Sequence, residues 1–185
     1  MSHTLLIKNM VCARCKMTVL QVLKDLGFKV QSVELGRVVV AERENYDYTN
    51  LEIELNELGF ELIKETTEAM VEQVKIALIE TVEKGDADFI LSEVAKKLGK
   101  NYSALSKTFS KHEGMTLEKY LINLKIEKVK EYIQLQQLNF SEIAYSLNYK
   151  NSSHLAKQFK SVTGMSMTDY KVLQNWERKS IDQIV

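Results

Sequence analysis

The sequence predicts two domains of different class: an α+β domain over residues 1–63 and an all-α domain over residues 64–175, with a C-terminal tail at 176–185. Two observations support this division. Short β-rich runs alternate with helical segments in the first 63 residues, and the chain after Leu91 contains two copies of one pattern. A chain of 185 residues is long enough for two small domains with separate hydrophobic cores.

Composition narrows the class of protein. The chain is 45% hydrophobic and 27% charged, as in an ordinary soluble globular protein. No apolar run is long enough to span a bilayer, and no basic segment precedes an apolar stretch near Met1. We therefore expect no membrane partner and a cytoplasmic location.

Charge is balanced overall but unevenly distributed. Residues 86–185 hold 15 Lys and Arg against 11 Asp and Glu, whereas residues 1–85 hold 10 against 14. A basic half joined to an acidic half predicts that only the second half binds an anionic partner. An ordinary solvated lysine-rich surface would produce the same asymmetry.

The first domain has a recognisable order of elements. We predict strands over 3–10, 30–35, 37–42 and 60–63, and helices over 15–26 and 51–58. This β-α-β-β-α-β order is the ferredoxin-like split pattern. A helix over 66–84 follows without a Gly-, Ser- or Pro-rich linker, and the chain has no proline, so we expect a stiff junction near residues 63–70.

The repeat covers 92–120 and 141–170, with a long linking helix predicted at 117–135. Several residues recur 50 positions apart: Leu105 and Leu155, Phe109 and Phe159, Gly114 and Gly164, Tyr120 and Tyr170. Ala95 and Ala144 are 49 apart, so the second copy has one extra residue in its turn. Each copy predicts a short helix, a turn and a second helix.

Local signals support two helix-turn-helix units. Ser92 and Ser141 are predicted to open the first helices, and Gly99 and Asn148 tolerate the positive φ of a turn. Asn101 and Asn151 are predicted N-caps of the second helices. The faces opposite the buried Leu and Phe residues are polar and basic: Ser103, Ser106, Lys107 and Lys111 in the first copy, and Ser153, His154, Lys157 and Lys160 in the second.

Such faces beside a helix N-terminus suit base edges and phosphates, so we predict double-stranded DNA as the partner. A helical bundle with solvated lysines is the alternative. Two copies that match in turn, core and exposed face favour DNA binding.

The repeat resembles the DNA-binding domain of the AraC family of transcription activators. The resemblance, assigned to residues ~66–175, depends on Ala95, Leu105, Phe109, Gly114, Tyr120, Ile143, Ala144, Leu155, Phe159, Lys160, Gly164 and Tyr170. It implies two recognition helices that enter successive major-groove segments on one side of the DNA. Base contacts are implied for Ser103, Ser106, Lys107, Ser153 and Lys157. The chain departs from the family in having Asn148-Tyr149 for Gly-Phe, Ser166-Met167 for Thr-Pro and Lys125 for an Arg.

Cys12 and Cys15 form a C-x-x-C pair after the first strand, with Cys15 predicted to open a helix. A helix N-terminus favours the thiolate, which binds soft metals. Residues ~1–63 resemble the heavy-metal-associated domain of copper chaperones and metal-pumping ATPases, whose loop is Gly-Met-x-Cys-x-x-Cys; Asn9 replaces the Gly and Met10 is kept. The resemblance implies a site for Cu(I) or Zn(II), with Arg14 offsetting its negative charge. A redox-responsive pair and a vestigial loop are left open.

Three functions compete. The first is a transcription regulator that responds to a soft metal ion at Cys12 and Cys15, and the second is a DNA-binding regulator whose first domain is a redox or dimerisation module, so a homodimer is left open. The third is a metal-trafficking protein with a helical docking domain. Because no Ser/His/Asp, paired-carboxylate or phosphate-loop arrangement is present, we do not expect an enzyme.

Overall fold

The computed structural model describes residues 2–41, 46–84, 90–173 and 179. The chain divides into two compact units, Met1–Ile76 and Ala77–Val185. The division falls within one helix, α3 (Thr66–Lys84), whose bounds are those predicted from the sequence. The predicted tail at 176–185 lies outside the described residues except for Lys179.

The first unit has the element order predicted for it. Its elements are β1 (Ser2–Lys8), α1 (Ala13–Asp25), β2 (Val30–Glu34), β3 (Arg37–Ala41), α2 (Tyr48–Glu57) and β4 (Glu61–Leu62). The strands form an antiparallel sheet in the order β2-β3-β1-β4, with Leu5 opposite Val38 and Ile7 opposite Leu62.

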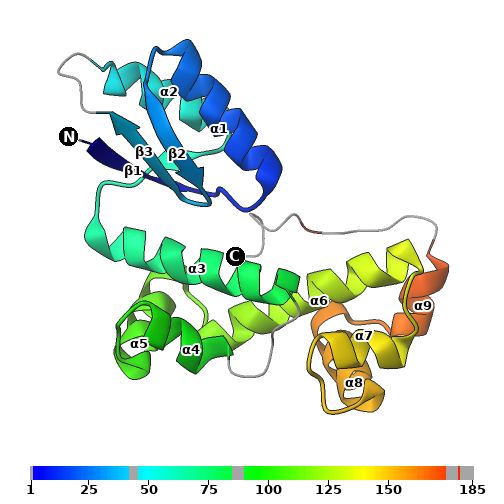
Figure 1. The fold of residues 1–185 in the computed structure, drawn as a ribbon. Coiled ribbons are helices and arrows are strands. Elements are labelled where there is room, and N and C mark those ends of the chain that lie inside the picture. The colour runs from blue at the N-terminus through cyan, green and yellow to red at the C-terminus, as the bar shows by residue number, and fades with distance from the viewer. Residues whose placement is uncertain (1, 42–45, 85–89, 174–178, 180–185) are drawn as a thin grey trace. The chain divides into compact units, whose positions relative to one another are not determined.

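The alternation of the strands decides which face of this sheet is covered. Leu5 and Ile7 of β1 and Val38 and Val40 of β3 are buried, because side chains two residues apart point to the same face. They pack against buried residues of α1 and α2, among them Val19, Leu23, Leu51 and Leu55. Figure 1 shows both helices on that face of the sheet.

Two helices begin earlier than the sequence predicted. Helix α1 begins at Ala13 with Cys12 as its N-cap residue, so Cys15 lies inside the first turn. Helix α2 begins at Tyr48, where the Asp47 side chain accepts a hydrogen bond of 2.9 Å from the Asn50 N–H. Periodicity missed both starts because the first turns carry little of the apolar stripe.

The second unit contains α4 (Ile90–Lys97), α5 (Tyr102–Glu113), α6 (Leu117–Leu135), α7 (Phe140–Ser146), α8 (Ser152–Thr163) and α9 (Met167–Val172). Helix α6 has the bounds predicted for the linking helix and runs between the α4–α5 pair and the α7–α8–α9 group (Figure 1). The prediction of two helix pairs joined by a long helix is confirmed.

The predicted starts of α4 and α7, the first helix of each helix-turn-helix pair, were wrong. Ser92 lies inside α4, which is helical from Ile90. Asn139, not Ser141, caps α7: its side chain accepts from the Ser141 and Glu142 N–H groups, and the Glu142 carboxylate accepts from the Asn139 N–H at 2.7 Å. This reciprocal capping box satisfies three backbone N–H groups at the start of α7, which explains why the helix begins before Ser141.

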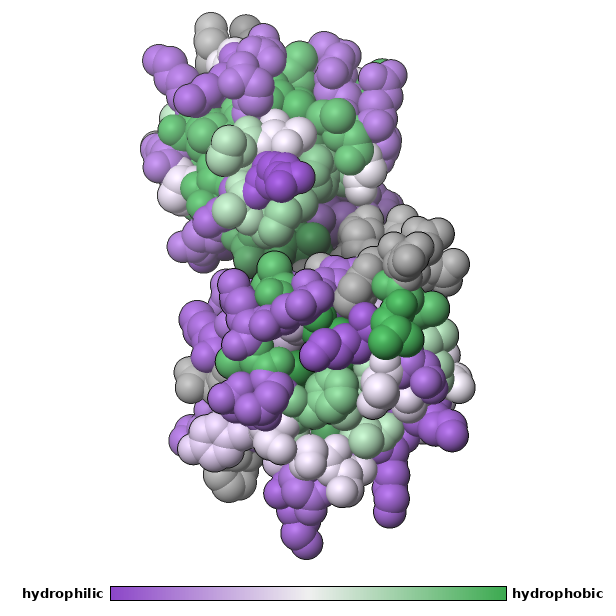
Figure 2. All heavy atoms as spheres, turned by 90° about the vertical axis from the view of Figure 1, so that its right-hand side faces the viewer, coloured by the Kyte–Doolittle hydropathy of each residue, from purple (hydrophilic) through white to green (hydrophobic). Residues whose placement is uncertain are grey.

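Among the described residues, no helix is both long and apolar enough to cross a membrane. Hydrophilic side chains are interspersed with apolar ones on the face drawn in Figure 2.

Candidate nucleic-acid interface and cysteine pair

The two turns have the predicted geometry. Gly99 has φ 62° and Asn148 has φ 53°, both in the left-handed region. The Asn101 side chain accepts hydrogen bonds from the N–H groups of Ser103 and Ala104, and Asn151 accepts one of 2.8 Å from the His154 N–H. Both predicted N-caps are confirmed, and each fixes where the second helix of its pair begins.

The two helix-turn-helix copies are also built alike inside. Phe109 of α5 contacts Tyr120 of α6 edge to face at 5.4 Å, and Phe159 of α8 contacts Tyr170 of α9 in the same way at 5.5 Å. Ala95 is buried in the first copy, as Ala144 is in the second, where a larger side chain would separate the crossing helices. The start of α6 therefore packs against α5 in the same way as α9 packs against α8.

Burial orients the two recognition helices. Leu105 and Phe109 are buried in α5, and Leu155 and Phe159 in α8. The predicted contact residues lie on the remaining faces: Ser103, Lys107, Lys111, Ser153, His154, Lys157 and Lys160 are exposed, and Ser106 is half-buried. The fold therefore presents every predicted DNA-contact residue at or near the surface of the two helices.

Two further lysines were missed by sequence reasoning. Lys100 and Lys150 are exposed, are 50 positions apart, and each immediately precedes the capping asparagine of a recognition helix. Neither forms an ion pair with another residue that the structure describes. The repeat register that identified Lys107 and Lys157 would have identified this pair as well.

Helix α6 holds the second turn in place. Lys125 Nζ donates a hydrogen bond of 2.9 Å to the Leu147 carbonyl and lies 5.4 Å from the centre of the Tyr149 ring. Lysine thus makes a turn contact at the position where the family has arginine. The Tyr149 hydroxyl is buried without a hydrogen-bond partner among the described residues, and burial raises the pKa of Tyr149 well above its usual range.

The first copy has an additional hydrogen bond between α5 and α6. The Tyr102 hydroxyl, on the first residue of α5, donates to the Glu118 carboxylate in the first turn of α6. This hydrogen bond raises the pKa of Tyr102 and lowers the pKa of Glu118. The corresponding positions of the second copy are Ser152 and Thr168, which lack the phenol and the carboxylate that form this hydrogen bond in the first copy.

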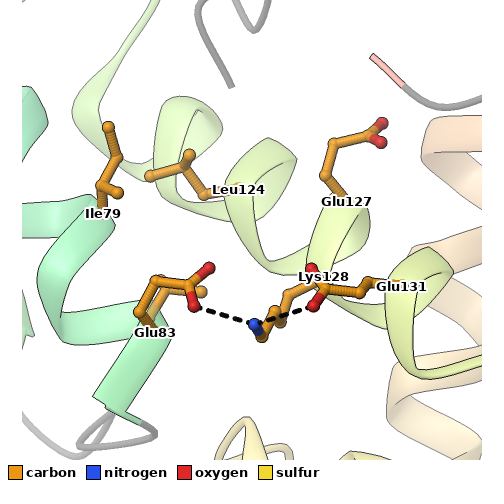
Figure 3. Close-up of a pocket in the computed structure, with 7 residues that line it drawn as sticks. Ile79, Glu83, Leu124, Glu127, Lys128 and Glu131 are labelled. Atoms are coloured by element: carbon orange, nitrogen blue, oxygen red, sulfur yellow. Dashed lines mark hydrogen bonds and ion pairs between the residues drawn. The ribbon is translucent and has the colours of Figure 1, made fainter. Parts of the chain in front are cut away.

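On α6, Lys128 Nζ lies 2.9 Å from a Glu83 oxygen and 3.3 Å from a Glu131 oxygen (Figure 3). Burial alone would lower the pKa of Lys128, but the two carboxylates outweigh it and raise the pKa. The apolar residues Ile79 and Leu124 line the same small hollow. These contacts hold the C-terminal turns of α3 against the linking helix.

The cysteine pair lies in the first unit, at the start of α1. Cys12 is exposed and Cys15 is half-buried, and their sulfurs are 3.3 Å apart without a disulfide bond. Burial opposes ionisation of Cys12, but hydrogen bonds from the backbone and side chain of Cys15 and from the backbone of Arg14, with the Arg14 charge, lower its pKa. Burial and the neighbouring Cys12 raise the pKa of Cys15. The sequence placed Cys15 at the helix N-terminus, but the N-cap residue, and the more acidic thiol, is Cys12.

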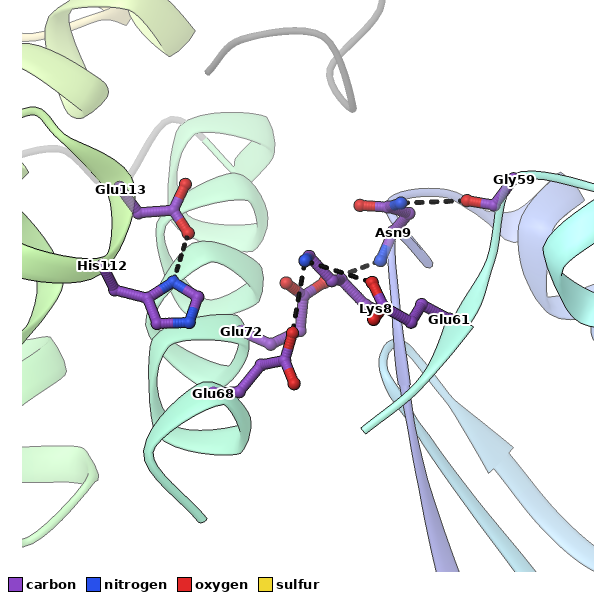
Figure 4. Close-up of polar contacts among 8 residues, drawn as sticks. All are labelled: Lys8, Asn9, Gly59, Glu61, Glu68, Glu72, His112 and Glu113. Carbon is purple, nitrogen blue, oxygen red and sulfur yellow. Dashed lines mark hydrogen bonds and ion pairs between the residues drawn. The ribbon is translucent and has the colours of Figure 1, made fainter. Parts of the chain in front are cut away.

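The loop before the cysteines is held from two sides. Asn9 has φ 69°, a conformation that glycine adopts readily and asparagine tolerates, which explains how it replaces the expected Gly. Its N–H donates to Glu72 and its side chain donates to the Gly59 carbonyl, both at 2.9 Å (Figure 4). Met10 is fully buried in the core. Among the described residues, no group of three or more His, Cys, Asp or Glu side chains surrounds the pair.

Residues 94–172 match the family model described as a helix-turn-helix domain. The chain is 27% identical over 86 residues to the HTH-type transcriptional regulator YtdP of Bacillus subtilis (strain 168), covering 46% of this chain. It is 26% identical over 111 residues to the Msm operon regulatory protein of Streptococcus mutans, covering 60% of this chain. The chain spans 11% and 39% of the lengths of these two relatives.

Among solved structures, the fold is similar to the C-terminal domain of AraT, a response regulator from Geobacillus stearothermophilus. The TM-score is 0.52 and the identity 19%, with 62% of this chain and 97% of that chain covered. This likeness concerns the fold. Together with the family match over residues 94–172, it shows that the second unit contains a helix-turn-helix domain with this fold.

Proposed function

We propose that the chain is a sequence-specific DNA-binding transcription regulator and that α5 and α8 are its two recognition helices. The observation that supports this most strongly is the matched placement of Lys107 and Lys157. Each is exposed, opposite a buried Leu and Phe, on a helix whose start is fixed by an asparagine cap. We include a cytoplasmic location in this proposal, because a transcription regulator acts where the DNA is.

The contacts divide by position along each helix. Residues in the N-terminal half of a recognition helix contact base edges in the major groove. In α5 these residues are Ser103, Ser106 and Lys107, and in α8 they are Ser153 and Lys157. Serine makes shorter-range contacts than arginine, so we expect modest discrimination at several bases. The phosphate contacts are assigned to Lys100 and Lys150, which precede the helices, and to Lys111 and Lys160 in their last turns, while His154 in the first turn of α8 belongs with the base-facing residues.

Recovery of the DNA fragments that the purified chain selects from a genomic library tests this function. We expect one enriched pattern with two short half-sites about one helical turn apart, since both recognition helices approach from one side of the duplex. Fragments that are enriched only by length, with no shared pattern, would contradict sequence-specific binding.

We propose further that Cys12 and Cys15 bind a soft metal ion, preferably Cu(I). In tetrahedral zinc sites, Zn–S bonds of about 2.3 Å place two sulfurs about 3.8 Å apart. The observed 3.3 Å must widen to reach that separation, and further for a near-linear two-coordinate Cu(I), which rotation of the two side chains provides. Two thiolates suffice for two-coordinate Cu(I), whereas Zn(II) requires two more ligands, which a second copy of the chain would supply.

Titration of Cu(I) and Zn(II) into the reduced protein tests the metal site. We expect about one Cu(I) per chain, and dimer formation only with Zn(II). The control is the Cys12→Ser/Cys15→Ser double variant. Equal metal uptake by both proteins would contradict the metal site. Uptake by the parent without a change in DNA affinity would contradict only regulation by the metal, since a ligand that binds the high-affinity and low-affinity states equally well does not shift the balance between them.

The same proposal includes the architecture of the first domain. The β-α-β-β-α-β order and the antiparallel sheet support a ferredoxin-like arrangement, and the Met10-x-Cys12-x-x-Cys15 loop supports the heavy-metal-associated resemblance. The lysine-bearing faces of α5 and α8 favour a DNA-binding regulator over a metal-trafficking protein.

A further inference from the structure

We propose that Cys12 and Cys15 also form a reversible dithiol–disulfide pair that exchanges with low-molecular-weight disulfides such as oxidised glutathione. The exchange itself does not depend on DNA binding or on metal binding. It gives the loop at the start of α1 a second chemistry, with Cys12 as the attacking sulfur and Cys15 as the resolving sulfur.

The geometry brings the two sulfurs almost to bonding distance. They are 3.3 Å apart, and a disulfide bond is about 2.05 Å long, so they must approach by about 1.2 Å. Cys12 is the N-cap residue of α1 and Cys15 is the third residue of its first turn. The two side chains therefore face each other across a single turn, where side-chain rotation provides the approach.

The surroundings of the two sulfurs differ, and this assigns their roles. Cys12 is exposed, whereas Cys15 is half-buried and packs against the hydrophobic core of the first unit. A dissolved disulfide therefore reaches Cys12 first.

The exchange balances in two steps. The Cys12 thiolate attacks one sulfur of oxidised glutathione, which forms a mixed disulfide and releases one glutathione thiolate. Cys15 then loses its proton to solvent and attacks the Cys12 sulfur, so that the Cys12–Cys15 bond forms and the second glutathione thiolate leaves. The protein is oxidised by two electrons and the glutathione disulfide is reduced by two.

The two chemistries of the loop exclude each other. A disulfide has no thiolate to offer, so the oxidised chain should not take up a soft cation.

The test compares three full-length reduced proteins under oxidised glutathione: the parent, Cys15→Ser and Cys12→Ser. Acid-quenched samples are analysed by mass spectrometry, and circular dichroism confirms that each variant is folded. The parent is expected to lose two hydrogen atoms per chain with no lasting adduct. Cys15→Ser should accumulate one glutathione adduct, and Cys12→Ser should form its adduct at least ~10-fold more slowly, because its remaining thiol is half-buried against the core.

Three outcomes would overturn the proposal: a parent that stops at the mixed disulfide, a parent that forms only disulfides between chains, or equal rates in the two single variants. Because Cys15 packs against the core, Cys15→Ala provides a second resolving-sulfur variant if the serine does not fold. DNA affinity is not a readout here, so failure of the exchange leaves the proposed DNA-binding function untouched, and the reverse also holds.

Discussion

The C-terminal ends of both recognition helices depend on a glycine, and replacing it should cost stability of a calculable size. Gly164 ends α8 with φ 82°, and its N–H donates a hydrogen bond of 2.8 Å to the Lys160 carbonyl. A Cβ added there meets no atom within 4 Å, so a substitution causes strain in the backbone and no clash. The left-handed conformation costs an ordinary L-residue about 1–2 kcal/mol. Gly164→Ala should lose this amount, and Gly164→Val more, because valine is β-branched.

Thermal unfolding followed by circular dichroism measures the loss. A destabilisation of 1 kcal/mol lowers the melting temperature of a domain of this size by about 4–8 °C. Gly114, with φ 68° and equally open space, should give the same series in α5. Gly164→Asn is the control and should lose least, since the chain already places Asn148 at φ 53°. A valine variant that melts with the parent would refute the left-handed ends of these helices.

Three further outcomes are expected. Lys111→Ala should weaken binding to all DNA sequences alike and reduce the slope of log affinity against log salt by about one, because a lysine towards the C-terminal end of α5 contacts phosphate; an unchanged slope would place it outside the interface. Tyr149→Phe should leave stability unchanged or raise it, since it removes a buried hydroxyl without a partner among the described residues, and a loss above about 1 kcal/mol would contradict this. The hydrogen bond from Tyr102 lowers the pKa of Glu118 in the folded protein, so the ionised Glu118 stabilises the fold above the ordinary Glu pKa and loses this effect as the pH falls through the lowered pKa. Tyr102→Phe should lack this small pH-dependent contribution when acid unfolding is measured.

Much of the fold follows from local rules that a single sequence displays. Helices α3 and α6 both have the predicted bounds, and α6 begins and ends on apolar residues, Leu117 and Leu135. Residues that tolerate positive φ marked the turns at Gly99 and Asn148 correctly. The register of the repeat placed the exposed face of each recognition helix, since burying a Leu and a Phe four residues apart fixes the opposite face.

Other features depend on contacts that sequence spacing does not reveal. The capping box of α7 was missed because Ser141 and Asn139 are both good N-caps, and only the reach of Glu142 decides between them. The bond from Lys125 to the Leu147 carbonyl joins residues 22 positions apart. The contact of Asn9 with Glu72 spans 63 positions, so neither could be inferred without the fold.

The claim that both recognition helices read one DNA site has a direct test. The affinity of the parent, Lys107→Ala, Lys157→Ala and the double variant should be measured on the DNA pattern that the parent selects. Lys24→Ala is the control, because it removes the same charge from an exposed position in the first unit.

Each single variant should lose about 1–3 kcal/mol, or about 5–150-fold in affinity, and the double variant about the sum, since the two lysines lie on different helices. The control should bind like the parent. Parent-like affinity in either single variant would show that its helix does not read the DNA.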